Sequence, residues 1–172
     1  EPVGVDLYQG RSSIMTTAVG NKVYAIDYSS YAVQDPIKVY NTDTQVTEPL
    51  ELDGMGGVLS SVLVSPNGNY LALVEMSFAG WSTRYSMNIY SLATGLKVYS
   101  KSDTSNSGRV SDSGVRRGMA WSPDSTKLAF WAFKQDLGNT ENGGVRSHVY
   151  VVNTSTWTAV ESQQTPFNFR SD

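Results

Sequence analysis

Short apolar runs rich in Val, Ile, Tyr, Phe and Trp recur along the whole chain, and clusters of Gly, Pro, Asn, Asp and Ser separate them. Runs of this length and composition between turn residues are typical of β-strands. No stretch repeats apolar residues at the spacing of three and four that an amphipathic helix requires. The pattern therefore predicts an all-β protein in which helix is nearly absent.

The predicted strands fall into three groups of four. The first group is 12–19, 22–28, 37–41 and 45–52; the second is 60–65, 69–76, 85–91 and 96–101; the third is 117–122, 126–133, 147–153 and 157–163. Pro49 indicates an edge position for its strand, because proline cannot donate a hydrogen bond to a neighbouring strand.

In two of the groups, nearly the same turn joins the first strand to the second. Ser65-Pro66-Asn67-Gly68 and Ser122-Pro123-Asp124-Ser125 each join two apolar strands. Proline presets the turn dihedral, and an Asn or Asp side chain can hydrogen-bond the backbone just beyond itself. We expect Asp124 to cap the backbone amides of its turn.

Equivalent positions recur at intervals of 50 and 57 residues, from Tyr40 to Tyr90 and from Pro66 to Pro123. A four-strand unit that repeats about every 50 residues is what a β-propeller blade predicts. We divide the chain into a lead-in (1–11), three blade-like units (12–52, 58–101 and 115–163) and the start of a further strand or tail (164–172).

The segments 65–72 and 122–129 resemble the SPDG-x-x-[LI]-A hairpin of β-propeller repeats related to WD repeats. Such repeats occur in the Tol-system periplasmic propeller protein and in propeller domains of prolyl-oligopeptidase-like enzymes. The resemblance covers about residues 12–163, although the first unit has Gly20-Asn21 in place of the motif and no unit has the Gly-His and Trp-Asp pairs of eukaryotic WD repeats. It implies antiparallel four-stranded blades and favours an extracytoplasmic location, but the motif is structural and carries no catalytic residue.

About three blades are present, whereas propellers close with four to eight. The resemblance therefore implies an incomplete ring, which further blades, another chain or copies of this chain would complete. A β-trefoil, which also contains three four-stranded repeats, is the alternative fold, with carbohydrate binding on exposed aromatic residues as its function.

The composition argues against several classes of function. The net charge is −3 and the 13 basic residues are scattered, which argues against nucleic-acid binding. The chain has no Cys, so disulfides and thiolate sites are excluded. No apolar run is long enough to span a membrane. Asp103, Asp112 and Asp136 are too dispersed for a calcium loop, and we expect neither a metal nor a cofactor.

Catalysis has little support in the sequence. His148 is the only His and lies inside a predicted strand, where a structural role is expected. No Gly-x-Ser-x-Gly elbow is present, so a serine-hydrolase site is not visible. We expect Phe130, Phe133, Trp121 and Trp131, which alternate within strands, to belong to the core.

The predicted connections differ between the two ends of the strands. Turns after the first and third strand of each unit are short, whereas the connections 29–36, 53–57, 77–84, 102–114 and 134–146 are long. Loops on a rigid scaffold commonly carry function, so the long-loop end is the predicted binding face. The candidate binding residues there are Trp81, Arg84 and Tyr85, a set typical of interface hot spots, and the pair Arg116 and Arg117.

These observations favour a non-enzymatic propeller scaffold that mediates protein–protein interaction through its long-loop face. The partner would be another protein or copies of this chain that complete the propeller. The propeller portion of a prolyl-oligopeptidase-like hydrolase is the alternative, with catalysis in another domain.

Overall fold

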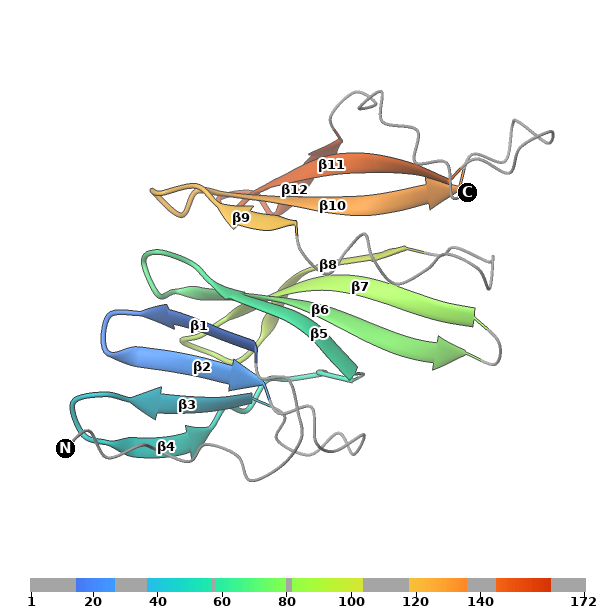
Figure 1. The fold of residues 1–172 in the computed structure, drawn as a ribbon. Coiled ribbons are helices and arrows are strands. Elements are labelled where there is room, and N and C mark those ends of the chain that lie inside the picture. The colour runs from blue at the N-terminus through green and yellow to red at the C-terminus, as the bar shows by residue number, and fades with distance from the viewer. Residues whose placement is uncertain are drawn as a thin grey trace.

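The computed structural model describes residues 15–26, 37–56, 58–79, 82–103, 118–135 and 145–161, and in this part of the chain all regular structure is β-strand. The strands form three antiparallel sheets of four, shown in Figure 1. Every sheet contains only strands that are consecutive in the sequence. The predicted all-β fold with four-stranded antiparallel units is thus confirmed.

The first sheet contains β1 (Met15–Val19), β2 (Lys22–Ile26), β3 (Ile37–Asn41) and β4 (Val46–Pro49), in that order. The strand β4 is the outer edge, and Pro49 lies opposite Lys38 in the register. The edge position predicted from Pro49 is therefore confirmed.

The second sheet contains β5 (Val58–Val64), β6 (Tyr70–Ala79), β7 (Ser82–Ser91) and β8 (Lys97–Asp103). The strands β6 and β7 are longer than predicted, since the pairing continues to Ala79 opposite Ser82. The prediction of a long loop over 77–84 was therefore wrong. Phe78 and Thr83 in this segment favour an extended strand, and only residues 80 and 81 separate the two strands.

The third sheet contains β9 (Met119–Trp121), β10 (Lys127–Gln135), β11 (Val145–Asn153) and β12 (Thr158–Glu161). His148 is a strand residue opposite Ala132, as expected. Here too the central strands run further than predicted, to Gln135 and from Val145. The connection between them is correspondingly shorter than the predicted 134–146.

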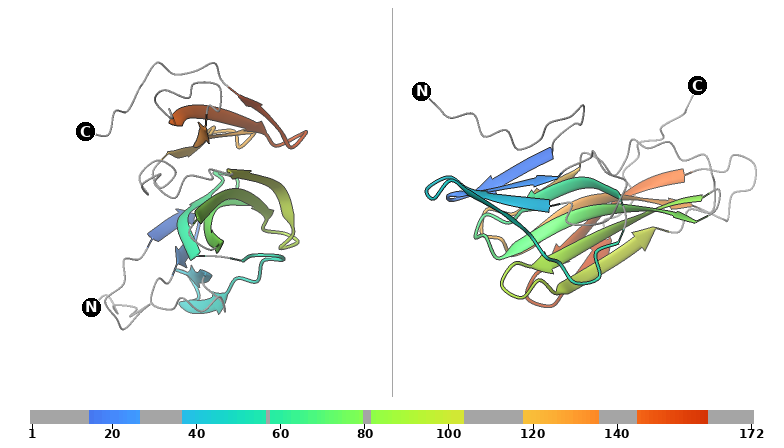
Figure 2. Two further views of the ribbon diagram at one scale, coloured as in Figure 1. Left: turned by 90° about the vertical axis from the view of Figure 1, so that its right-hand side faces the viewer. Right: turned by 90° about the horizontal axis from the view of Figure 1, so that it is seen from below.

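The three sheets stack face to face, with the second sheet in the middle (Figures 1 and 2). One buried cluster, which includes Tyr24, Ile37, Leu71 and Tyr90, lies between the first and second sheets. Another cluster lies between the second and third sheets and includes Phe130. Successive side chains along a strand point to opposite faces of the sheet, so the second sheet supplies side chains to both clusters.

The four aromatic residues expected in the core have different positions. Phe130 is buried, and Trp121 is half-buried against the cluster between the second and third sheets. Trp131 is half-buried on the other face of the third sheet, where the alternation along β10 places it. The side chain of Phe133 lies outside the described part.

Hydrogen bonds also join neighbouring sheets at their innermost strands. The hydroxyl of Thr17 accepts a bond from the amide of Val64 at 3.2 Å. The indole Nε1 of Trp121 donates to the carbonyl oxygen of Leu63, also at 3.2 Å. These bonds fix the sheets side by side along β1, β5 and β9.

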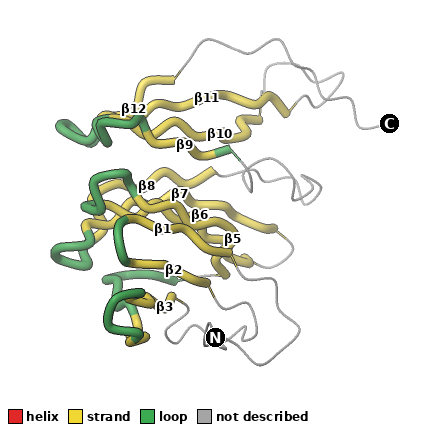
Figure 3. Tube along the Cα trace, turned by 60° about the vertical axis from the view of Figure 1, so that its left-hand side comes forward, coloured by secondary structure: helices red, strands yellow, loops and turns green. Residues whose placement is uncertain are grey.

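The short turns after the first and third strands gather at one end of the stack (Figure 3). In the third sheet, Oδ1 of Asp124 accepts bonds from the amide of Thr126 at 3.1 Å and from the hydroxyl of Ser122 at 2.6 Å. The expected cap by Asp124 is thus confirmed. Asn67 makes the equivalent bonds in the second sheet, from the amide of Asn69 at 3.0 Å and the hydroxyl of Ser65 at 2.7 Å.

The strand pairing excludes the β-trefoil alternative for the described residues. A β-trefoil needs a barrel in which strands of different repeats pair with one another. Here no sheet mixes strands of different units. The carbohydrate binding inferred from that alternative loses its structural basis.

Candidate binding groove

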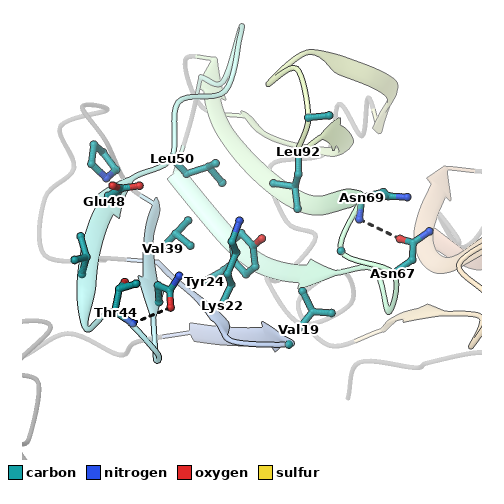
Figure 4. Close-up of a pocket in the computed structure, with 16 residues that line it drawn as sticks. Val19, Lys22, Tyr24, Val39, Thr44, Glu48, Leu50, Asn67, Asn69 and Leu92 are labelled. Atoms are coloured by element: carbon teal, nitrogen blue, oxygen red, sulfur yellow. Dashed lines mark hydrogen bonds between the residues drawn. The ribbon is translucent and has the colours of Figure 1, made fainter.

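An open groove with a volume of about 890 Å³ separates the first sheet from the turns of the second. Figure 4 shows its lining side chains, which come from both sheets. The first sheet contributes Val19, Gly20, Lys22, Tyr24, Val39, Asn41, Thr44, Val46, Glu48, Pro49 and Leu50, and the second contributes Asn67, Gly68, Asn69, Leu92 and Ala93.

One face of the first sheet forms the long wall of the groove. Tyr24 lies opposite Val39, which in turn lies opposite Glu48 in the register. The next row along the strands is Lys22, Asn41 and Val46. Because residues two apart on a strand share a face, both rows lie on the same wall. The first row is mainly apolar and the second is mainly polar.

The chemical character of the wall changes from its floor to its rim. Tyr24 is buried at 3% exposure, and burial raises the pKa of its phenol above the ordinary value. Lys22 and Glu48 are exposed and carry opposite charges. Val46 is an exposed apolar side chain in the same groove, with 48% of its surface accessible.

The opposing wall is a rigid pair of turns from the second sheet. The amide of Leu92 donates to the carbonyl oxygen of Asn69 at 2.9 Å, which ties the two turns together. Gly68 has a φ of 72°, and a Cβ built on it would lie 3.5 Å from Cγ1 of Val19. The turn therefore packs closely on the end of β1 and places Asn67 and Asn69 at the rim of the groove.

The connection between the first and second sheets is anchored beside the groove. The amide of Asp53 donates to the carbonyl oxygen of Gly95 at 2.9 Å, and Nζ of Lys97 donates to that of Gly54 at 3.0 Å. The amide of Gly56 donates to Oε2 of Glu75 at 3.2 Å. Three bonds thus hold this connection, and Leu50 at its start is part of the groove.

The groove has the general features of a ligand-binding site. It has an apolar floor and a few polar side chains at its rim, as ligand sites commonly have, and its volume lies in their usual range. Within the described ranges no group of three His, Cys, Asp or Glu residues could hold a metal ion. The part of the chain that is described also holds no helix long and apolar enough to cross a membrane.

Of the five predicted binding residues, Arg84 and Tyr85 lie in strands that the structure describes. Arg84 and Tyr85 are residues of β7, opposite Ser77 and Met76. Tyr85 is half-buried and packs against the cluster between the second and third sheets. Trp81, Arg116 and Arg117 lie outside the described residues, so their binding role stays a prediction.

Sequence reasoning missed the groove because it placed binding at the opposite end. Much of the predicted long-loop face lies outside the described residues, namely 29–36, 104–114 of the predicted loop 102–114, and 136–144 of the predicted loop 134–146. The groove lies at the short-turn end and depends on how two sheets meet. The charged Lys22 at the start of β2, directly after a turn, was the one local signal for it.

The sequence matches no protein-family model and no curated protein. Solved structures are similar in fold. The tricorn protease matches with a TM-score of 0.59 and 15% identity over 91% of this chain and 14% of that chain. Hydrazine synthase of Kuenenia stuttgartiensis matches with a TM-score of 0.54 and 18% identity, over 83% and 39% of the two chains. The β-propeller domain of the Trilobed protease from Pyrococcus furiosus matches with a TM-score of 0.53 and 9% identity, over 85% and 41%.

This chain spans less than half the length of each of these proteins. Identities this low support the fold alone. The three stacked sheets, each built from four consecutive antiparallel strands, and the similarity to a β-propeller domain agree. The described sheets are therefore blades of a β-propeller.

Proposed function

We propose that this chain is a non-enzymatic β-propeller scaffold that binds a protein partner. The observation that carries the proposal is the groove between the first and second sheets. Its apolar floor, its polar rim and its exposed Val46 suit a peptide segment of another protein. The two Ser-Pro-Asn/Asp hairpins further suggest repeats of the Tol-system type.

The long-loop face belongs to the same proposal as a second contact surface. Loops at that end would add contacts from Trp81, Arg116 and Arg117, and the location would be extracytoplasmic. A scaffold of this kind needs no cofactor, and both charged residues in the groove serve recognition.

Selection from a random-peptide library on the immobilised 172-residue chain tests the proposal. Enriched peptides are then synthesised and titrated by calorimetry against two matched variants. Val46 and Thr47 are adjacent, exposed residues of the edge strand β4, and only Val46 lines the groove. Val46→Arg should weaken binding at least tenfold, whereas Thr47→Arg should leave it unchanged.

Two outcomes would overturn the proposal: no peptide is enriched, or both variants bind as well as the wild type. Circular dichroism of each variant separates a lost contact from a lost fold. A peptide that is insensitive to both substitutions binds elsewhere on the chain, and the groove then loses its assigned role.

The propeller portion of a hydrolase is the second candidate function. Its support is that two of the similar structures are parts of proteases, the tricorn protease and the Trilobed protease. The length of the intact gene product separates the candidates. A downstream α/β domain with a nucleophile elbow favours the hydrolase, and further blades alone favour the scaffold.

A further inference from the structure

The three sheets share a set of equivalent positions around their short turns. In each sheet one backbone bond joins the two turns: Thr42 N to Asn21 O at 2.8 Å, Leu92 N to Asn69 O at 2.9 Å, and Thr154 N to Thr126 O at 2.9 Å. The residues that directly follow the three acceptors are therefore equivalent. They are Lys22, Tyr70 and Lys127.

Two more positions follow from the same geometry. The amide of Gly95 donates to Ser91 O, and that of Trp157 donates to Asn153 O, both at 2.8 Å. Gly95 and Trp157 also share a positive φ, 70° and 52°. Val64 and Trp121 are likewise equivalent, because each directly precedes the Ser that starts the first short turn of its sheet.

Where the second and third sheets meet, aromatic rings occupy these equivalent positions. Tyr70 stacks on Trp121 with ring centroids 6.2 Å apart and an angle of 21° between the planes. The ring of Trp157 meets Tyr70 edge-on, with centroids 4.9 Å apart. Such pairs stabilise an interface beyond the apolar area that they bury.

The same place between the first and second sheets has none of these rings. Lys22, Val64 and Gly95 stand where the aromatic residues stand one sheet further along. No side chain fits easily at Gly95, because a Cβ there would lie 3.0 Å from the carbonyl oxygen of Glu51. Of these three residues Lys22 lines the groove, together with Leu92 and Ala93 of the connection that contains Gly95.

Building on the proposed function, we infer that the groove takes an aromatic side chain of the protein partner. The ring would lie on the apolar floor of Tyr24, Val39 and Leu50 and stand in for the aromatic residues that this interface lacks. A volume of about 890 Å³ holds one ring and part of the peptide backbone on either side of it.

Lys22 supplies the charge that favours an aromatic group over an aliphatic one. A lysine ammonium attracts the face of an aromatic ring. The same contact occurs among the described residues, with Nζ of Lys97 at 5.4 Å from the ring centroid of Tyr90 and Nζ of Lys101 at 4.2 Å from that of Tyr150. Glu48 on the first-sheet wall and the side chain of Asn69 on the opposing wall offer acceptors for an indole or backbone N–H.

Nuclear magnetic resonance titration of the full chain with N-acetyl-L-tryptophanamide tests the inference, with N-acetyl-L-leucinamide as the control probe. We expect the amide signals of Lys22, Asn41, Gly68 and Asn69 to shift, and the tryptophan probe to bind at least fivefold more tightly. Equal affinity for the two probes, or shifts confined to other residues, would overturn the inference.

Two substitutions at equivalent positions sharpen the test. Lys22→Tyr places in the groove the residue that Tyr70 provides in the second sheet, and should abolish binding of the probe. Lys127→Tyr makes the same change at the equivalent position of the third sheet and should have no effect. Lys22→Met keeps the aliphatic stem without the ammonium and should weaken binding about two- to fivefold.

The peptide selection distinguishes this inference from the proposed function. Peptides with a Trp, Tyr or Phe whose replacement by Leu abolishes binding support both. Peptides without an aromatic residue that still respond to Val46→Arg overturn the inference and leave the proposed function standing. Binding of the tryptophan probe with no enriched peptide overturns the protein partner and indicates a small aromatic ligand instead.

Discussion

The phenol oxygen of Tyr90 lies 2.8 Å from Oε1 of Glu75, and both side chains are buried in the second sheet. The other carboxylate oxygen of Glu75 accepts the amide of Gly56, so the pair also holds the connection from the first sheet. Burial, this hydrogen bond and the nearby charges of Glu75 and Asp53 raise the pKa of Tyr90 well above its ordinary value. The phenol therefore stays protonated and remains a donor.

Replacing Tyr90 by Phe should lower the free energy of unfolding by about 1–3 kcal/mol, because a buried carboxylate oxygen loses its donor. Chemical denaturation followed by circular dichroism measures the change. Tyr40→Phe is the control, since this ring is half-buried in the first sheet rather than buried against Glu75. Equal losses in the two variants would contradict the role assigned to the pair.

The carboxylate of Asp124 makes the stability of its turn depend on pH. Hydrogen bonds from the hydroxyl of Ser122 and from the amide and hydroxyl of Thr126 lower its pKa to about 2. A group whose pKa is lower in the folded chain stabilises the fold above its unfolded pKa. That stabilisation should be lost as the pH falls from about 4 to about 2.

Asp124→Asn tests this, since Asn67 makes the equivalent bonds in the second sheet. We expect the variant to have a lower melting temperature than the wild type at pH 7 and the same one at pH 2. Thermal melts at pH 7, 4 and 2 provide the comparison. A difference that does not depend on pH would show that the charge of Asp124 is not involved.

Ser125 combines a strained backbone with a bond between sheets. Its φ is 60°, a region that residues with a Cβ adopt at a cost, and its hydroxyl oxygen accepts the amide of Asn67 at 3.0 Å. Ser125→Gly removes both the strain and the bond, whereas Ser125→Ala removes only the bond. We expect Ala to be the more destabilising of the two by about 1 kcal/mol. Equal denaturation midpoints for the two variants would contradict this reasoning.

Local sequence signals predicted most of the fold. Each of the three groups of four strands exists, and the residues of the Ser-Pro-Asn/Asp turns make the bonds expected of them, because a turn and its flanking strands are determined within a few residues. The extent of β6 and β7 was less predictable. A Gly-Trp pair with flanking Ser and Thr is compatible with both a loop and the tip of a long hairpin.

The groove could not be predicted from any single stretch. Its walls come from two sheets, and Lys22 of β2, Asn69 before β6 and Leu92 after β7 lie far apart in the sequence. The comparison with Tyr70, Trp121 and Trp157 likewise needs the equivalence of the turns in space.

The outer face of the third sheet carries the last prediction. A row of apolar residues crosses it, and none of them is buried: Ala120, Ala129, Val151 and Val160, with Trp131 and Val149 in the adjacent row. Trp131 lies against the backbone of Gly118, where a Cβ would be 2.7 Å from its Cδ1. The corresponding apolar faces of the other interfaces are covered by a neighbouring sheet. No described sheet covers this apolar face, and an uncovered apolar face is a site of association.

We therefore expect the purified 172-residue chain to associate rather than to remain a monomer of 18.8 kDa. Light scattering after size-exclusion chromatography, over a range of concentrations, measures its mass. Val160 is 71% exposed on this face and Leu96 is 51% exposed in a turn of the second sheet, which gives a matched pair of substitutions. Val160→Lys should shift the mass toward the monomer, because a charge would have to be desolvated in the contact, and Leu96→Lys should not. A wild-type chain that stays monomeric at every concentration would show that this face needs no further partner.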